Sequence, residues 1–128
     1  MENNIKQLVC VLIPAYNEAK YIAKSIGAIL KQDYENLEII VINNASTDDT
    51  SEIVEKLIHS NQSKINIRLI YERNKGTQFA REAGRRVANG SIIAQMDADC
   101  VPSFRWISKG VRMLFDCGGH PRMSKLQQ

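Results

Sequence analysis

Apolar residues along this chain form continuous runs separated by segments with helical spacing. The runs at 8–13, 37–42 and 92–96 predict strands that are buried on both faces. At 65–71 apolar positions alternate with more polar ones, which predicts a further strand nearer the edge of the sheet. Pro14 follows the first run and is expected to stop that strand.

Apolar residues at helical spacing lie after each run and predict four helices. Ser46 or Thr47 is expected to cap the second helix, Asn89-Gly90 to end the third, and the fourth to begin near Pro102-Ser103. The expected core-facing residues are Ile22, Ile26, Ile29 and Leu30; Ile53, Val54, Leu57 and Ile58; Phe79, Ala80, Ala83, Gly84, Val87 and Ala88; and Phe104, Ile107, Val111 and Leu114.

The alternation of apolar strands with helices predicts the α/β class, with an open, mainly parallel sheet covered by helices on both faces. With 128 residues we expect one domain, over 1–116, followed by a tail without periodicity over 117–128. No apolar run is long enough for a membrane span. The N-terminus is polar, and the three cysteines are odd in number and lack a C-x-x-C spacing, so we expect a reducing, cytoplasmic location.

The charge pattern is mildly basic, with a net charge of +3 and a pI of about 8.8. Without a strong basic stripe or interleaved aromatic residues, we expect no nucleic-acid partner. Arg105, Lys109 and Arg112 share the outer face of the fourth predicted helix. That face either is simply solvated or meets anionic headgroups at the inner side of a membrane, and both interpretations stay open.

Polar residues follow every predicted strand, where open parallel sheets bind ligands. Asp97 and Asp99 come after the last strand with one small residue between them, so both carboxylates can face one spot. Such a pair suits a hard divalent cation that also binds substrate phosphates. The first predicted strand lacks the G-x-G-x-x-G that a dinucleotide fold needs after it, and the chain has no G-K-[ST] for a P-loop.

Four segments together resemble the nucleotide-sugar-binding half of a family 2 glycosyltransferase with the Rossmann-like GT-A fold. The resemblance covers roughly residues 7 to 115, and the segments occur in the family's order and spacing. They are V-L-I-P-A-Y-N-E-A (11–19), N-N-A-S-T-D-D-T (43–50), N-K-G-T-Q-F-A-R-E-A-G (74–84) and M-D-A-D (96–99).

The resemblance implies a role for each matching position. Tyr16 would lie against the nucleotide base, Arg81 would face the diphosphate or donor sugar, and Asp97 and Asp99 would bind Mg²⁺ or Mn²⁺, with Asp99 the firmer contact. Asn44 stands where the family commonly has an aspartate. The nucleotide-sugar-binding residues so implied are Pro14, Ala15, Tyr16, Asn17, Glu18, Asn44, Ser46, Gly76, Arg81 and Asp97.

The implied activity is transfer of a sugar from a nucleotide-diphospho-sugar to an acceptor hydroxyl. The family's catalytic base lies beyond the D-x-D segment, so we assign none and expect a truncated or frame-shifted reading of a longer enzyme. The alternative is a nucleotide-sugar-binding module or fragment without turnover. Exposed apolar surface where a second half would dock predicts self-association. The donor sugar, acceptor, linkage and stereochemistry stay open.

Overall fold

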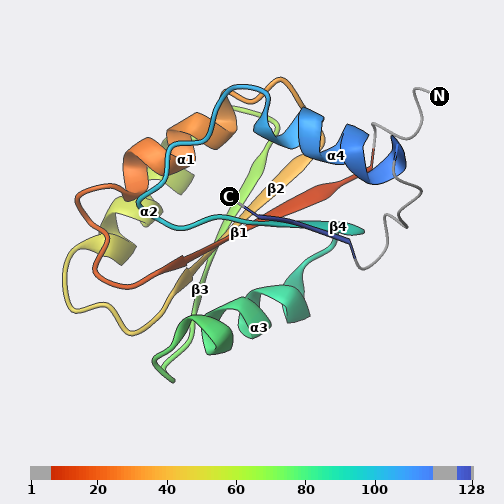
Figure 1. The fold of residues 1–128 in the computed structure, drawn as a ribbon. Coiled ribbons are helices and arrows are strands. Elements are labelled where there is room, and N and C mark those ends of the chain that lie inside the picture. The colour runs from red at the N-terminus through yellow and green to blue at the C-terminus, as the bar shows by residue number, and fades with distance from the viewer. Residues whose placement is uncertain (1–6, 117–123, 128) are drawn as a thin grey trace.

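The computed structural model describes residues 7–116 and 124–127. Within them, five parallel strands form one sheet in the order β3-β2-β1-β4-β5, flanked by four helices (Figure 1). The strands are β1 (Val9–Ala15), β2 (Leu37–Asn43), β3 (Asn66–Tyr71), β4 (Ile92–Gln95) and β5 (Ser124–Gln127). The helices are α1 (Ile22–Leu30), α2 (Thr50–Ser60), α3 (Thr77–Val87) and α4 (Trp106–Asp116). This architecture confirms the predicted α/β class.

Helices cover both faces of the sheet, as Figure 1 shows with α1, α2 and α4 on one side and α3 on the other. The larger core lies under α1, α2 and α4, and the smaller one lies under α3. The small-residue face of α3 explains its close approach, because a Cβ on Gly84 would stand 3.0 Å from Ile42 Cδ1 and 3.1 Å from Leu12 Cδ2. The edge position of β3 agrees with its alternating pattern.

Pro14 lies inside β1 and does not stop it, contrary to expectation. Even-numbered residues of β1 turn their backbone groups toward β4, since Met96 N–H donates to Leu12 O at 3.0 Å. The pairing of β1 with β4 ends at Leu12 opposite Gln95, whereas β1 pairs with β2 as far as Ala15. Pro14 therefore sits where the β1–β4 ladder has already ended, and its missing N–H costs no ladder hydrogen bond.

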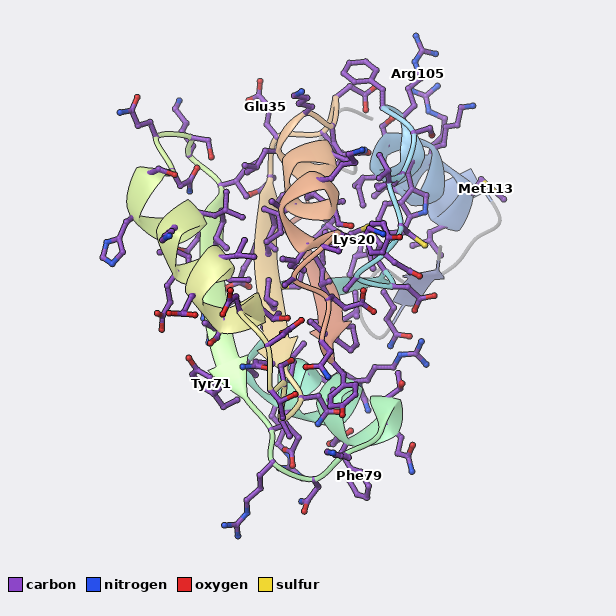
Figure 2. All side chains as sticks on the ribbon, turned by 90° about the vertical axis from the view of Figure 1, so that its left-hand side faces the viewer. Lys20, Glu35, Tyr71, Phe79, Arg105 and Met113 are labelled. Carbon is purple, nitrogen blue, oxygen red and sulfur yellow. The ribbon has the colours of Figure 1, made fainter. Side chains whose placement is uncertain are left out.

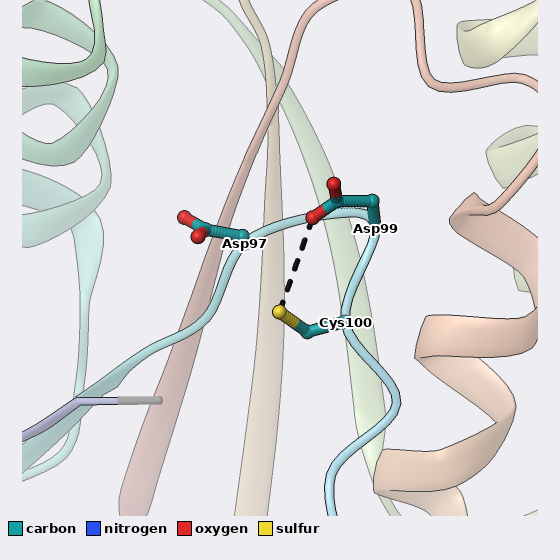
Figure 3. Close-up of side chains that lie close together, drawn as sticks. All are labelled: Asp97, Asp99 and Cys100. Carbon is teal, nitrogen blue, oxygen red and sulfur yellow. Dashed lines mark hydrogen bonds between the residues drawn. The ribbon is translucent and has the colours of Figure 1, made fainter.

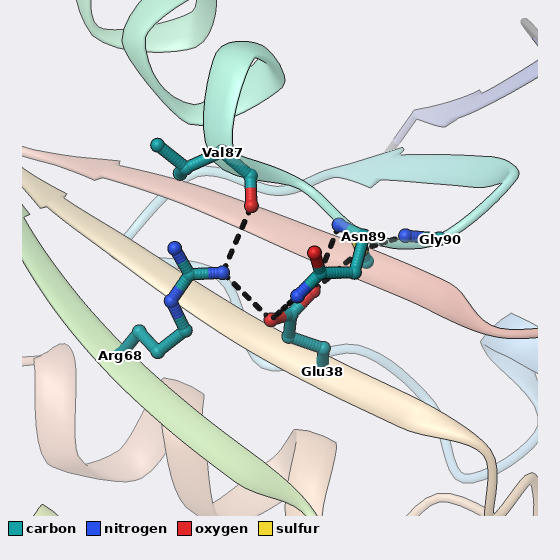
Figure 4. Close-up of polar contacts among 6 residues, drawn as sticks. Glu38, Arg68, Val87, Asn89 and Gly90 are labelled. Carbon is teal, nitrogen blue, oxygen red and sulfur yellow. Dashed lines mark hydrogen bonds and ion pairs between the residues drawn. The ribbon is translucent and has the colours of Figure 1, made fainter.

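A buried carboxylate joins the end of α3 to the sheet at the amino ends of the strands (Figure 4). Glu38 accepts hydrogen bonds from Cys10 Sγ (2.8 Å), Arg68 Nη1 (2.8 Å) and Asn89 Nδ2 (3.0 Å). Burial by itself raises the pKa of Glu38, but these hydrogen bonds and the Arg68 charge outweigh burial and hold that pKa below its usual value. Burial, followed by the hydrogen bond to Glu38, raises the pKa of Cys10 to about 12.

Three expected helix ends differ from the structure. Helix α2 begins at Thr50 after Asp49, and neither Ser46 nor Thr47 caps it. Helix α3 ends in extended backbone at Ala88, so Asn89-Gly90 does not form the usual left-handed end. Gly90 is required for a different reason, because a Cβ there would lie 2.4 Å from the Leu8 carbonyl oxygen.

Helix α4 begins later than expected, at Trp106. Phe104 lies before the helix and is 60% exposed, so its expected place in the core is wrong, while Ile107 and Val111 are buried as predicted. Among the described residues, no helix is long and apolar enough to cross a bilayer.

The tail expected over 117–128 lies largely outside the described residues. Within it, Ser124–Gln127 form β5, which pairs in parallel with β4 although the sequence there has no strand pattern. The domain boundary at 116 stays a prediction.

Candidate functional site

A pocket of about 250 Å³ lies at the carboxyl ends of the central strands. It brings together residues that are far apart in the sequence: Pro14, Ala15, Tyr16, Glu18, Asn44, Thr77, Asp97, Ala98 and Asp99. Seven of the residues singled out from the sequence are among them. Asn17, Ser46, Gly76 and Arg81 do not line the pocket, whereas Thr77 and Ala98 were not predicted to line it.

A larger cavity of about 750 Å³ lies elsewhere, next to the α1–β2 and α2–β3 connections. Among its lining residues are Asp33, Glu35 and Lys64. The described residues form one group of three side chains suited to a metal ion, Asp97, Asp99 and Cys100. The two aspartates of this group line the smaller pocket. The smaller pocket is therefore the better candidate for chemistry.

The D-x-D segment lies in a turn that three hydrogen bonds hold in place. Figure 3 shows Asp97, Asp99 and Cys100 on this turn. Cys100 N–H donates to Asp97 O at 3.1 Å and closes the turn, while Met96 N–H donates to Leu12 O on β1. The Ala98 side chain is buried, and its carbonyl accepts a 2.6 Å hydrogen bond from Ser25 Oγ on α1. With Ala98 held inward, Asp97 and Asp99 are both exposed at the pocket. The two carboxylates face the same side because of this turn, and not because they lie on an extended strand as predicted.

The pocket concentrates negative charge on this side. Burial raises the pKa of Glu18, and the charges of Asp99, Asp48 and Asp97 raise it further. Burial and the same two aspartates of the turn raise the pKa of Cys100. One oxygen each of Asp97 and Asp99 and the Cys100 sulfur lie within 4.8 Å of one another. This donor set fits a divalent cation, which would relieve the repulsion among the carboxylates.

Asn17 and Ser46 join the loops that follow β1 and β2. Asn17 has a positive φ of 53°, and its Oδ1 accepts hydrogen bonds from the backbone N–H groups of Thr47 (2.8 Å) and Asp48 (3.2 Å). Ser46 Oγ accepts one from Asn17 N–H at 2.9 Å. These contacts shape the loop that presents Tyr16 and Glu18, so Asn17 and Ser46 act on the pocket from outside it.

Asn44 is buried and its carboxamide holds the β3–α3 connection. Its Nδ2 donates to the carbonyls of Glu72 (2.9 Å) and Asn74 (2.8 Å), and its Oδ1 accepts from Gly76 N–H (2.9 Å). Both amide protons are thus used within the protein. Gly76 has a φ of 137°, which residues with a side chain rarely adopt, and it directly precedes α3.

Aromatic surface lies beside the pocket. Tyr16 is 46% exposed, and Lys75 Nζ stands 5.0 Å from the centre of its ring. Phe79, on the first turn of α3, is exposed rather than in the core as expected, and Figure 2 shows it projecting outward. An exposed ring at a pocket mouth can stack against a flat ligand.

The start of α3 supplies groups suited to an anion. Thr77 is the first residue of α3 and lines the pocket, and no side chain caps this helix. One turn later, Arg81 carries a buried Nε for which the described residues provide no hydrogen-bond partner. Thr77 could have been found from the Gly-Thr pair that opens the helical spacing, because the first turn of a helix facing strand ends is an anion site.

Sequence comparison relates this chain to a known protein family. The sequence profile of "Glycosyl transferase family 2" matches residues 10–117. The chain belongs to glycosyltransferase family 2. It is 35% identical over 112 residues to glycosyltransferase AglE of Haloferax volcanii, covering 86% of this chain and 36% of AglE. It is 41% identical over 110 residues to an uncharacterised glycosyltransferase of Haemophilus influenzae, covering 84% of this chain and 32% of that protein.

Solved glycosyltransferase structures share the fold. The mannosyltransferase PcManGT of Pyrobaculum calidifontis, in complex with GDP-Man and Mn²⁺, superposes with a TM-score of 0.79 at 31% identity, over 84% of this chain and 32% of PcManGT. S. aureus TarS in complex with UDP-GlcNAc gives a TM-score of 0.70 at 25% identity, over 85% of this chain and 31% of the TarS chain. This family 2 glycosyltransferase chain thus spans about a third of the length of the relatives named above.

Proposed function

We propose that the pocket binds a nucleotide-diphospho-sugar together with Mg²⁺ or Mn²⁺, as the donor site for transfer of the sugar to an acceptor hydroxyl. The observation that carries the proposal is the anchored turn, which holds Asp97 and Asp99 in the same pocket as Tyr16 and Thr77. Neighbours of the same fold are known with UDP-GlcNAc and with GDP-Man and Mn²⁺, which supports this ligand class.

Each side of the pocket suits one part of the donor. The exposed ring of Tyr16 would lie against the base, and the first turn of α3 with Arg81 would receive the diphosphate. Asp97 and Asp99 would hold the cation, which neutralises the charge that develops on the departing nucleoside diphosphate. Asn44 would act indirectly, by holding the loop that leads into α3.

Transfer itself needs a base that activates the acceptor hydroxyl, and we assign none. Donor binding is the step that the groups lining this pocket support. A binding module without turnover remains the alternative, and transfer of a labelled sugar to any acceptor would exclude it. Location in the cytoplasm or at the inner face of a membrane stays a prediction from the sequence.

The test is a thermal-shift panel of UDP, GDP, dTDP and their sugars, each with Mn²⁺ and with EDTA. At about 100 times Kd a ligand stabilises the folded chain by about 2.7 kcal/mol, so one nucleotide should raise Tm by several degrees only with Mn²⁺. The Asp97→Asn/Asp99→Asn variant should lose this rise, and Asp33→Asn, which faces a different cavity, should keep it. No shift with any nucleotide would contradict the proposal.

A further inference from the structure

The cation-binding turn contains a sulfur atom beside its two carboxylates. Cys100 follows Asp99 directly, and the hydrogen bond from its N–H to Asp97 O folds the segment so that residues 97, 99 and 100 come together. Cys100 Sγ lies 3.9 Å from Asp99 Oδ1. Figure 3 shows the two side chains facing each other. Cys100 is only partly buried, unlike Cys10, whose thiol is fully buried and donates to Glu38.

The spacing of the three donor atoms approaches that of a shared metal ion. An ion that bonds oxygen at about 2.0–2.2 Å and sulfur at about 2.3 Å can join donors up to about 4.5 Å apart. The Cys100–Asp99 distance already falls within this limit, and the widest separation among the three atoms, at most 4.8 Å, exceeds it only slightly. A small side-chain rotation would close the set, because both carboxylates are exposed.

We infer that Cys100 is a third donor of the cation site and gives this chain a preference for thiophilic divalent cations over Mg²⁺. The inference rests on the proposed function, which supplies the cation at Asp97 and Asp99. Thiolate sulfur selects zinc-like ions, whereas Mg²⁺ takes oxygen ligands and keeps several waters. Zn²⁺ and Cd²⁺ should therefore bind through all three side chains, and Mg²⁺ through the carboxylates alone.

The experiment measures metal binding directly, without an activity assay. Cys117 lies outside the described residues, so all proteins carry Cys117→Ser to remove its thiol from the signal. Each is titrated by calorimetry with Cd²⁺ and with Mg²⁺, in the presence and absence of the nucleotide found in the thermal-shift panel. Cd²⁺ should produce a sulfur-to-metal charge-transfer band in the ultraviolet, and Cys100→Ser should abolish that band.

The affinities distinguish a sulfur ligand from a residue that only shapes the turn. Cys100→Ser should weaken the binding of Cd²⁺ by about tenfold or more, because even residues that only contact a metal ligand change metal affinity by that much. The affinity for Mg²⁺ should stay unchanged. Equal weakening of both ions, or a Cd²⁺ complex without the band, would overturn the inference. Asp97→Asn/Asp99→Asn should weaken both.

Two readouts keep the inference separate from folding and from the proposed function. X-ray absorption of the Zn²⁺-loaded parent protein should show sulfur at about 2.3 Å and needs no variant at Cys100. An oxygen-only shell would overturn the inference, while Mn²⁺-dependent nucleotide binding would leave the proposed function standing. If neither metal nor nucleotide binds, both fail.

Discussion

At the scale of single residues, the amide nitrogen of Asn44 decides how this side chain holds the β3–α3 connection. Its Nδ2 faces the carbonyl oxygens of Glu72 and Asn74, and its Oδ1 receives the N–H of Gly76. A carboxylate could keep the last contact but not the first two. The aspartate that resemblance to the family would suggest is therefore incompatible with the loop that this chain builds.

We expect Asn44→Asp to lower the free energy of unfolding by about 2–4 kcal/mol, because two buried donors become acceptors facing carbonyl oxygens. Urea unfolding at neutral pH measures the loss. Asn66→Asp makes the same change of charge at an exposed position on β3 and should cost little. A variant as stable as the wild type would show that the carboxamide does not hold the loop.

Residues whose chemistry is visible in their type and spacing can be identified from the sequence, whereas the role of a residue with distant partners cannot. Asp97 and Asp99 could be singled out because two acids follow a buried strand. Asn17 and Ser46 could be named by resemblance, but their hydrogen bonds to each other's loops span about thirty residues of sequence. No local pattern indicates that these side chains point toward backbone and not toward a ligand.

At the scale of elements, adding a side chain at a glycine can raise or lower stability, depending on where the glycine lies. Gly27 lies within α1, and a Cβ there would meet no atom within 4 Å. Gly90 follows α3, where a Cβ would stand 2.4 Å from a backbone carbonyl that cannot move aside cheaply.

We expect Gly27→Ala to stabilise the chain by about 1 kcal/mol, because alanine favours helix over glycine by that amount. Gly90→Ala should destabilise it by about 1–3 kcal/mol, as overpacking does in cores. Thermal unfolding of both variants at the same pH provides the measurement. Equal effects of the two substitutions would contradict the different surroundings of Gly27 and Gly90.

The junction of β2, β3 and α3 should make stability depend on pH through Glu38. In the unfolded chain this carboxyl titrates near its usual pKa of about 4.3, and in the folded chain its pKa is lower. The contribution of Glu38 to the free energy of unfolding is therefore complete above about pH 5. It is lost as the pH falls through the pKa of the unfolded chain toward the lower pKa of the folded chain. The raised pKa of Glu18 acts in the opposite direction.

We expect Glu38→Gln to lower stability at neutral pH by about 1–3 kcal/mol, since it weakens a buried charged network. The deficit should shrink as the pH falls from about 6 to about 3. Urea unfolding across this range measures it. Glu82→Gln, which removes an exposed ion pair with Arg85, is the control and should show no such trend. A deficit independent of pH would rule out a lowered pKa.

The spacing of apolar residues predicted strands and helices correctly where those residues are buried, as in β1, β2 and α1. The helices differ from the predicted pattern where apolar residues are exposed to solvent. Phe104 and Phe79 continued a helical pattern but are exposed, so the pattern extended α4 too far and gave α3 too wide a core face. The order of the strands in the sheet depends on which distant segments pair. Predicting the α/β class does not determine this order.

At the scale of the whole molecule, large apolar side chains remain exposed on the side of α4. Val101 and Phe104 lie on the connection that leads into α4, and Met113 lies on the helix, each more than half exposed. Figure 2 places Met113 and Arg105 at the opposite end of the view from Phe79 and the start of α3. Met113 and its neighbours on this side therefore lie away from the start of α3, where they favour association of one copy with another.

We expect the chain to self-associate weakly as its concentration rises, with burial of these residues as the driving force. Phe104→Ser/Met113→Ser should raise the concentration of half-association about tenfold or more, which needs a loss of only about 1.4 kcal/mol. Tyr71→Ser removes a similarly exposed ring from the β3 edge and is the matched control. Light scattering after size-exclusion chromatography gives the mass at each concentration. Association that responds to Tyr71→Ser and not to the α4 variant would move the contact to the sheet edge, whose unpaired backbone groups are the competing site.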